Sequence, residues 1–473
     1  MQIIEENKIL LKKQNVFLGF FSAMGGGIKN FFIRFAVCGF PVKISYFIMG
    51  FGNFCYKQFI KGFIYLILQA GFIAFMALCP RVNNTPFGYK ALINFTTLGT
   101  NPGDIFSSAD NSMLMLLFGV VTICIIGLFF LLYLSNIKSA YKAECDTRKF
   151  GKAQTFIEDI KHLLDNRFNV TLLTPIFIGV AIFTIMPTLF MIAIAFTNFD
   201  SRHQGDVLFD WVGFANIADL FIRQGEIGQR FLPVLGWTLT WTVFATFTCY
   251  FGGICLGIMI NMKGVRYKAF FRTIFILTIA MPQFVSLLAV RNLLGELGPF
   301  NTMLQNLGIT NEPIAFLGTS ESVLRTRITI ILTNFWIGVP YTMLMTTGIL
   351  MNIPPDLYEA ARIDGAGRFK ILAKITMPYI IFITTPYLIS SFVGNFNSFN
   401  IIFLLTGGNP TAPGGYKAGT TDLLVTWLFK LSIDEKEYNL GAVVGIMTFL
   451  CTSIITLVTY RRSRAYKEEN RFQ

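Results

Sequence analysis

Long apolar segments constrain this chain more than any other feature. A helix needs about 20 apolar residues to cross the hydrocarbon core of a bilayer, and about eight such segments recur along the 473 residues. The predicted spans are 60–79, 113–134, 171–197, 234–260, 270–291, 327–351, 376–405 and 439–460. Only 14% of the residues are charged, against roughly 25% in soluble proteins. The sequence therefore predicts an all-α integral membrane protein.

The loop cations predict how these spans are oriented. Lys and Arg gather in residues 1–57, 135–170 and 261–272 and in the tail, whereas the loops 80–112 and 198–233 hold few. Cytoplasmic loops carry the excess of cations in membrane proteins. We therefore expect both termini to be cytoplasmic. The net charge of +13 sits in short clusters between apolar runs, which argues against binding to nucleic acid.

We predict three parts along the chain. Residues 1–58 form an N-terminal region, 59–168 carry two spans and a cytoplasmic loop, and 169–473 form a six-helix core. Within the first part, recurring cations favour interfacial amphipathic helices over 14–50. A cleaved signal peptide and a further span between 31 and 51 remain open alternatives.

Prolines interrupt several of the predicted spans. Because proline removes a backbone hydrogen bond, it kinks or breaks a helix. The sequence does not indicate which of these kinks would act in gating. The prolines concerned are Pro175, Pro187, Pro282, Pro340 and Pro386.

No segment of the sequence indicates catalysis. The only Gly-Lys pair, Gly151-Lys152, is followed by Ala153, so the phosphate-binding loop of ATPases is absent. The eight cysteines form no CxxC pair, and the sequence suggests neither a zinc site nor a disulfide framework. We expect no enzyme activity, no catalytic residue, no metal site and no cofactor bound by this chain.

One predicted cytoplasmic segment reads as two short helices joined by a glycine turn. Pro355 suits a helix start, and Asp356 and Glu359 lie in the first turn, where the helix dipole favours acids. Gly365 and Gly367 permit the chain to reverse before the seventh span. An ordinary interhelical loop is the alternative.

The order Glu-Ala-Ala, Asp-Gly-Ala and a later proline at Pro378 resembles the EAA signature of binding-protein-dependent ABC importer permeases. In that family the segment is the coupling helix that docks in a cleft of the cytoplasmic ATPase. The resemblance implies a type I permease core in a bacterial cytoplasmic membrane. The implied ATPase-coupling residues are Glu359, Ala360, Ala361, Asp364 and Gly365.

The seventh predicted span carries polar residues inside an apolar segment. Ser391, Asn395 and Ser398 fall at i, i+4 and i+7, so they would form one stripe on a helix. Hydroxyls and amides both donate and accept hydrogen bonds, as a neutral sugar requires. The same groups also bond across helix interfaces in membranes, and the residues alone leave both roles open.

The second half of the chain resembles maltose/maltodextrin permease subunits of the MalF type. Its segments 334–341, 390–399 and 415–425 carry this likeness. The implied substrate-binding residues are Gly338, Tyr341, Ser391, Gly394, Asn395 and Ser398. Gly394 replaces an aromatic residue of the family pattern and Ser398 replaces an asparagine. These changes leave the exact sugar open.

The resemblance implies a function in import driven by ATP. The chain would form half of a heterodimeric pore that carries maltose or maltodextrin by alternating access. Its implied partners are a MalG-type second permease, two ATP-binding subunits that use ATP and magnesium, an extracytoplasmic sugar-binding protein and the lipid bilayer. The alternatives are another neutral oligosaccharide, a glycerol-phosphate-type solute, or an ion-coupled secondary transporter.

Overall fold

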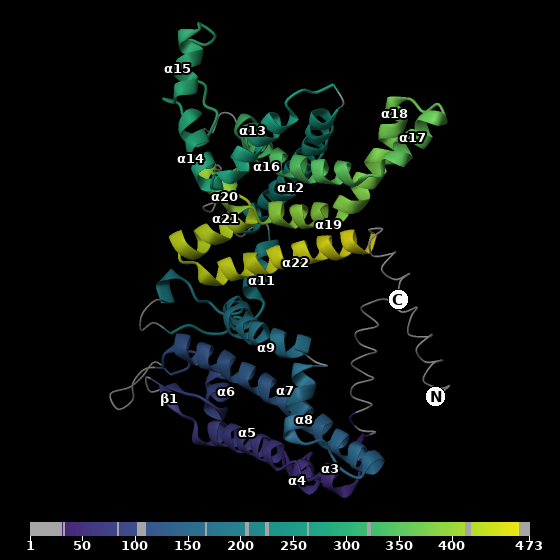
Figure 1. The fold of residues 1–473 in the computed structure, drawn as a ribbon. Helices are drawn as coiled ribbons and strands as arrows, with labels where there is room; N and C mark the ends of the chain where they lie inside the picture. Colours follow the sequence, from purple (N-terminus) through teal and green to yellow (C-terminus); the bar gives the residue numbers. More distant parts are fainter. Residues whose placement is uncertain are drawn as a thin grey trace. The chain divides into compact units, whose positions relative to one another are not determined.

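A computed structural model describes residues 31, 34–82, 85–101, 110–165, 168–203, 208–222, 227–262, 264–318, 323–411 and 418–462. Helices dominate the described residues, which confirms the predicted fold class (Figure 1). The chain divides into two compact units, Met1–Met191 and Ile192–Gln473. The three-part division of the sequence stays a prediction.

The N-terminal unit combines membrane-length helices with short helices and a two-stranded hairpin. Its first elements are α3 (Phe40–Ile44), α4 (Phe51–Cys55), α5 (Phe59–Leu78), β1 (Arg81–Val82), β2 (Thr85–Pro86) and α6 (Tyr89–Thr96). They are followed by α7 (Ser112–Phe150), α8 (Phe156–Leu164), α9 (Phe168–Val180), a π-helical turn (Ala181–Ile185) and α10 (Met186–Ile194). The helices expected over 14–50 lie mostly outside the described residues; α3 is a short piece within that range.

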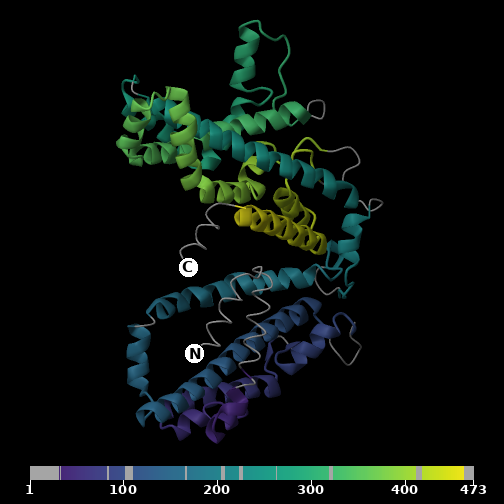
Figure 2. The same ribbon diagram turned by 90° about the vertical axis from the view of Figure 1, so that its right-hand side faces the viewer.

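Local capping explains where the long helix α7 begins and ends. The Asn111 side chain accepts a hydrogen bond from the Leu114 N–H at 3.0 Å, which satisfies one free donor of the first turn. Gly151 ends the helix in the left-handed conformation, with φ 72°. A capping box of Thr155 and Glu158 then starts α8, which bridges the end of α7 and the start of α9 (Figure 2).

The C-terminal unit contains the helices that carry the predicted sites. It begins with a 3-10 turn (Ser201–His203), α11 (Ala215–Phe221), α12 (Gly228–Asn261), α13 (Lys268–Ala280), α14 (Gln283–Leu293), α15 (Pro299–Asn306) and α16 (Val323–Asn352). It continues with α17 (Pro355–Ile363), α18 (Arg368–Ile371), a π-helical turn (Leu372–Thr376), α19 (Met377–Phe396), α20 (Phe399–Leu405), α21 (Leu424–Phe429), a second π-helical turn (Lys430–Asp434) and α22 (Tyr438–Arg462).

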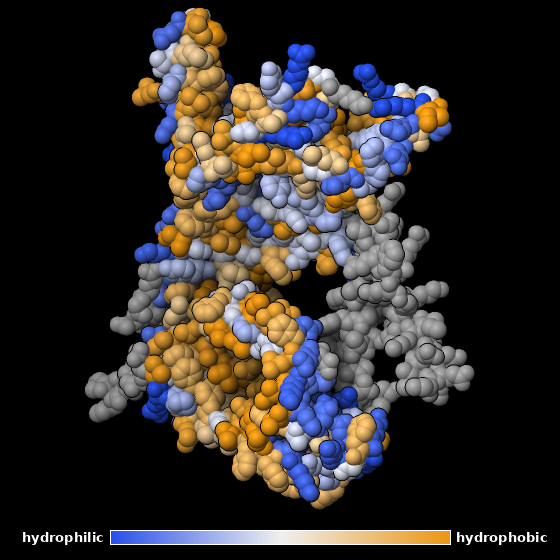
Figure 3. All heavy atoms as spheres, in the orientation of Figure 1, coloured by the Kyte–Doolittle hydropathy of each residue, from blue (hydrophilic) through white to orange (hydrophobic). Residues whose placement is uncertain are grey.

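Seven helices of the described chain are long and apolar enough to cross a membrane, and a bent pair raises the total to eight. The predicted number of spans is thus confirmed. Apolar side chains cover broad surfaces of α5 and α7 (Figure 3), as expected for helices that face lipid.

Two predicted spans differ from the structure. The fifth, 270–291, is broken at Pro282 into α13 and α14, which are bent by 92°. The seventh, 376–405, ends at Phe396, and α20 is a separate helix after a turn at Asn397. Pro282 follows Met281, which already has extended backbone, whereas Pro340 and Pro386 remain inside helices.

Helices α12 and α16 pack closely against each other at the centre of the C-terminal unit. A Cβ atom at Gly253 would lie 2.4 Å from the Thr342 Cβ, and one at Gly257 would lie 3.0 Å from the Thr346 Cβ. The glycines therefore let the two backbones approach, as small residues do in membrane helix pairs. A cluster around Trp237, Trp241, Leu287, Ile330, Ile402 and Leu423 forms the buried core at the end near α20.

Candidate transport site and coupling surface

The predicted cytoplasmic helix exists as α17. It begins at Pro355 after Pro354, has Asp356 in its first turn, and ends at Ile363. Gly365 then reverses the chain with φ 73°, a conformation that glycine adopts without steric cost. The predicted second helix, α18, runs without interruption through a π-helical turn into α19. The local fold of the segment therefore agrees with the prediction, except that Glu359 lies in the second turn of α17 and not in the first.

The surface of α17 is open to a partner. Glu359 and Ala360 are exposed, as are Asp364 and Gly365, while Ala361 is half-buried. Two apolar side chains that sequence reasoning missed stand beside them, since Ile363 is 87% exposed and Phe369 82% exposed. Figure 3 shows the resulting mixture of hydrophilic and hydrophobic residues at this end. Ile363 lies outside the candidate spans, and an exposed apolar group in such a place is typical of an interaction surface.

One hydrogen bond ties α17 to the membrane helix that follows. The Tyr358 hydroxyl lies 3.2 Å from the Thr376 hydroxyl, at the end of the π-helical turn that leads into α19. Thr376 is buried and Tyr358 is half-buried, so this contact is partly shielded from water. A displacement of α17 would therefore reach α19 through this contact as well as through the backbone. Neither residue was predicted, because their pairing depends on the fold.

Asn395 of the predicted polar stripe is held between helices. Its side-chain amide donates to the Thr246 hydroxyl on α12 at 2.9 Å, and its backbone carbonyl accepts from the Trp241 indole at 3.1 Å. Because α19 ends at Phe396, Ser398 lies beyond the helix at the N-cap of α20. The stripe is therefore shorter than the predicted i, i+4, i+7 series.

Tyr341 of α16 pairs with Tyr387 of α19. The ring centroids are 5.4 Å apart with planes inclined by 30°, and Tyr341 remains 53% exposed. The Tyr387 hydroxyl lies 3.3 Å from the Thr342 hydroxyl, and Ser391 lies one turn later on the same helix, half-buried. The structure thus brings Tyr341 of α16 against α19, on which Ser391 lies. Sequence reasoning missed Tyr387, although its place one turn before Ser391 was a usable signal.

The two predicted glycines have different surroundings. A Cβ atom at Gly338 would lie 2.7 Å from the Cys249 sulfur, so Gly338 is a close-packing position against α12. Gly394 is exposed, and a Cβ atom there would meet nothing within 4 Å. An open face therefore lies beside Asn395, with room for a ligand or a further side chain.

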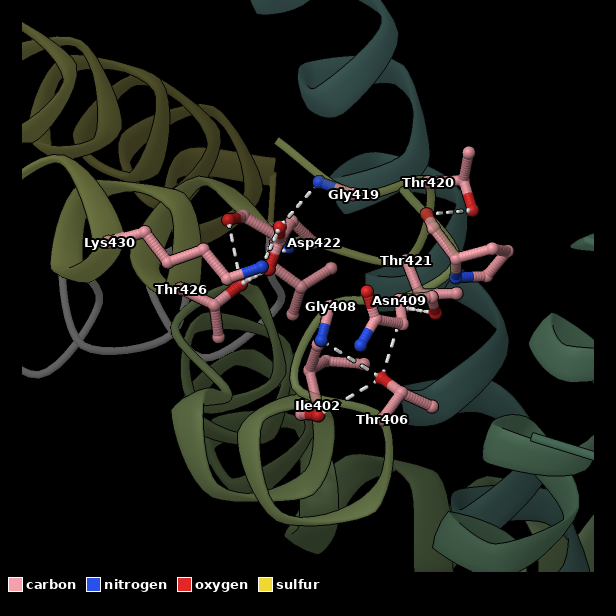
Figure 4. Close-up of polar contacts among 12 residues, drawn as sticks. Ile402, Thr406, Gly408, Asn409, Gly419, Thr420, Thr421, Asp422, Thr426 and Lys430 are labelled. Carbon is pink, nitrogen blue, oxygen red and sulfur yellow. Dashed lines mark hydrogen bonds and ion pairs between the residues drawn. The ribbon is translucent and has the colours of Figure 1, made fainter. Parts of the chain in front are cut away.

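A buried carboxylate organises the turn beyond α20. Asp422 accepts hydrogen bonds from the Gly419 N–H at 2.7 Å, the Thr426 hydroxyl at 2.9 Å and the Lys430 ammonium at 2.6 Å. Gly408 packs so closely on it that a Cβ atom would lie 2.1 Å from a carboxylate oxygen (Figure 4). Burial raises the pKa of Asp422, although Lys430 opposes that shift.

No group of three or more His, Cys, Asp or Glu side chains suited to a metal ion occurs within the described part of the chain. The polar groups around Tyr341 and Asn395 are hydroxyls and an amide. They can bind hydroxyl groups but offer no nucleophile held by a base. The arrangement therefore suits recognition of a neutral polar ligand.

Comparisons with known proteins give a consistent result. A family model described as "Binding-protein-dependent transport system inner membrane component" matches residues 253–466. The galactooligosaccharides transport system permease protein GanP of Bacillus subtilis is 34% identical over 429 residues, which is 89% of this chain and 97% of that protein. The maltodextrin transport system permease protein MdxF of the same organism is 32% identical over 430 residues, 89% of this chain and 95% of that protein.

More distant similarities extend this result. The maltose/maltodextrin permease MalF of Escherichia coli is 34% identical over 262 residues, 53% of this chain and 49% of that protein. A solved bacterial ABC transporter involved in the import of the acidic polysaccharide alginate contains a chain with a TM-score of 0.54 and 24% identity. That similarity covers 65% of this chain and 99% of that chain, and it concerns the fold.

Proposed function

The chain belongs to the inner-membrane components of binding-protein-dependent transport systems and is a permease subunit of an ABC sugar importer; from this premise we propose that it forms half of a pore for neutral oligosaccharides of the maltodextrin type. It is a transport component, and ATP hydrolysis takes place in a separate subunit. Alternating access carries the sugar across the multi-pass membrane domain.

One observation carries this proposal: a single helical span connects the two candidate sites. The span runs from Arg368 to Phe396, with the exposed turn of α17 at its start and Asn395 at its end. The ATPase would bind α17 through Glu359 and the exposed Ile363. Because a ligand shifts a conformational equilibrium only by differential binding, this surface must bind the ATPase more tightly in one of its states.

The composition of the open face supports a neutral sugar. Tyr341 offers an aromatic face, and the carbonyl oxygen of the Asn395 amide has no hydrogen-bond donor among the described residues. Aromatic faces with nearby hydrogen-bonding groups suit sugar rings. The relatives include a galactooligosaccharide and maltodextrin permeases, so linkage and chain length must be tested together.

The proposal includes the partners of the complex. A second permease subunit would complete the pore, two ATPase subunits would bind ATP and magnesium, and an extracytoplasmic protein would deliver the sugar. Both termini and α17 would then face the cytoplasm, in agreement with the cationic loops. This chain itself would bind neither ATP nor magnesium.

ATP hydrolysis by the reconstituted complex tests this function. The complex is supplied with its binding protein and, in separate reactions, with maltodextrins, galacto-oligosaccharides, alginate oligosaccharides or glycerol phosphate. Stimulation by maltodextrins alone is the expected result. Stimulation by galacto-oligosaccharides instead would overturn the proposal that maltodextrins are the substrate. Absence of any bound ATPase would overturn the proposed coupling role of α17.

A further inference from the structure

A cavity of about 500 Å³ opens in the C-terminal unit, and none of the sequence-predicted site residues lines it. Its walls are the end of α14, the turn before α15 and the turn after α20. These segments lie at the end of the unit away from α17, because α19 runs from the α17 turn toward α20 (Figure 1). The volume is in the range of small-molecule sites.

Three polar side chains converge on this cavity with unused hydrogen-bonding capacity. Arg291 makes one long contact, 3.5 Å from its guanidinium to the Leu404 carbonyl. The side-chain amides of Asn292 and Asn409 have no partner among the described residues. Together they offer both donors and acceptors, and no acid belongs to the lining that would neutralise Arg291.

Apolar side chains complete the cavity. Leu405 is buried in the wall, while Leu297 at the rim is 98% exposed. A leucine of that exposure beside open polar groups indicates a surface suited to an amphipathic ligand. Sugar rings have this character, since their C–H faces are apolar and their edges carry hydroxyls.

The floor of the cavity is rigidly supported. Arg327 donates to the Thr420 carbonyl at 2.7 Å and stacks on the Trp237 ring at 4.2 Å. The Trp237 indole in turn donates to the Thr421 carbonyl at 3.0 Å, and the Thr421 hydroxyl donates to the Asn409 carbonyl at 2.6 Å. Figure 4 shows this turn, with Asn409 beside Gly408 and Thr421. The Asn409 backbone is thus held at the cavity before any ligand arrives, so that only rotation of its side chain remains to be fixed on binding.

The cavity is connected to the candidate sugar site through the chain. The chain turns at Asn397 between α19 and α20, and the seven residues of α20 alone span about 10 Å at 1.5 Å per residue. A ligand that extends from the open face of α19 would therefore reach the cavity only if it contained several sugar units.

We propose that the cavity formed by Arg291, Asn292 and Asn409 is an outer subsite for the distal units of a neutral oligosaccharide. The inference rests on the proposed sugar transport and adds selectivity for chain length. Short sugars fill the site beside Tyr341 and Asn395 and do not touch the cavity. Longer sugars gain hydrogen bonds to the two amides.

Transport of sugars of different length tests the proposal in the full reconstituted complex. Asn292→Ala and Asn409→Ala each remove one exposed amide of the cavity. Asn306→Ala is the control, because it removes an exposed amide at the end of α15 that does not line the cavity. For each variant, kcat/KM of uptake is measured with the binding protein loaded with maltose or with maltohexaose. Losing one hydrogen bond should lower the value for maltohexaose about three- to tenfold.

The outcomes separate this proposal from the function on which it rests. The proposal predicts a selective loss for maltohexaose in both variants of the cavity, unchanged maltose uptake, and no change in Asn306→Ala. An equal loss for both sugars would overturn it and identify a docking surface for the binding protein. Unchanged uptake of both sugars would overturn it as well. If the unmodified complex transports neither sugar, the proposed substrate fails before the subsite is addressed.

Discussion

Filling the space at Gly394 should change which sugars the permease accepts. A Cβ atom at this position meets nothing within 4 Å, and the residue lies in regular helix near the end of α19. The Cβ atom of Gly394→Phe would therefore displace no neighbour, and the position is exposed. The new ring would stand beside Asn395, where the resemblance to maltose-type permeases expects an aromatic residue.

The size of the effect follows from the surface that the ring would cover. One sugar ring stacked on Phe would remove about 40–60 Å² of apolar surface from water, which is worth about 1–1.5 kcal/mol. That corresponds to a gain of roughly 5- to 12-fold in affinity for a disaccharide. Longer oligosaccharides should lose transport, because the ring occupies space that they need.

Sugar-stimulated ATP hydrolysis measures both effects. The rate is recorded as a function of the concentration of binding protein loaded with maltose or with maltohexaose. Gly179→Phe is the matched control, since a Cβ atom at Gly179 on α9 also meets nothing within 4 Å. The open face beside Asn395 does not contact the ligand if both substitutions change the ATP hydrolysis stimulated by maltose and by maltohexaose equally. The same conclusion follows if Gly394→Phe changes the stimulation by neither sugar.

Three further substitutions test separate parts of the structure. Glu359→Lys reverses a charge on the exposed surface of α17 and should abolish uptake while the chain remains inserted in the membrane; normal uptake would refute the docking role. Gly253→Leu would press a side chain into Thr342 at a cost of about 1–3 kcal/mol and should lower the midpoint of thermal unfolding, whereas Gly236→Leu, which meets nothing within 4 Å on the same helix, should not. Burial raises the pKa of Asp422, so the folded chain binds this proton more tightly than the unfolded chain, and stability should rise as pH falls through that raised pKa toward the ordinary pKa of an aspartate. Hydrogen exchange of the Asp422 loop, corrected for intrinsic rates, should show stronger protection at lower pH in the unmodified chain, and this increase should be absent in Asp422→Asn. Protection that weakens as the pH is lowered would contradict the expected direction.

The spans and the short helix α17 could be predicted because their causes are local. A bilayer requires long apolar runs whatever the tertiary fold, and Pro355 and Gly365 begin and reverse α17 through their own backbone preferences. The break at Pro282 is a different case. Proline also occurs within α16 and α19 at Pro340 and Pro386, where the helices continue, so the residue type alone does not determine whether a span breaks.

The contacts of the candidate site could not be predicted from spacing. Tyr341 and Tyr387 lie on different helices, and their contact depends on how closely α16 and α19 pack. The same limit applies to Asn395, whose partner Thr246 lies on α12. Sequence periodicity identifies which residues share a face of one helix, but it contains no distance between helices. Residue types alone therefore left sugar recognition and helix packing both open, while Tyr387 and the outer cavity emerged only from the fold.

Accumulation of labelled maltodextrin in proteoliposomes tests the central claim most directly. The complex is reconstituted with its ATPase and binding protein, and no ion gradient is imposed. The account predicts that the sugar accumulates above its outside concentration only when ATP is supplied to the ATPase side, and that Glu359→Lys prevents accumulation. Accumulation driven by an imposed ion gradient without ATP would contradict the account and favour a secondary transporter.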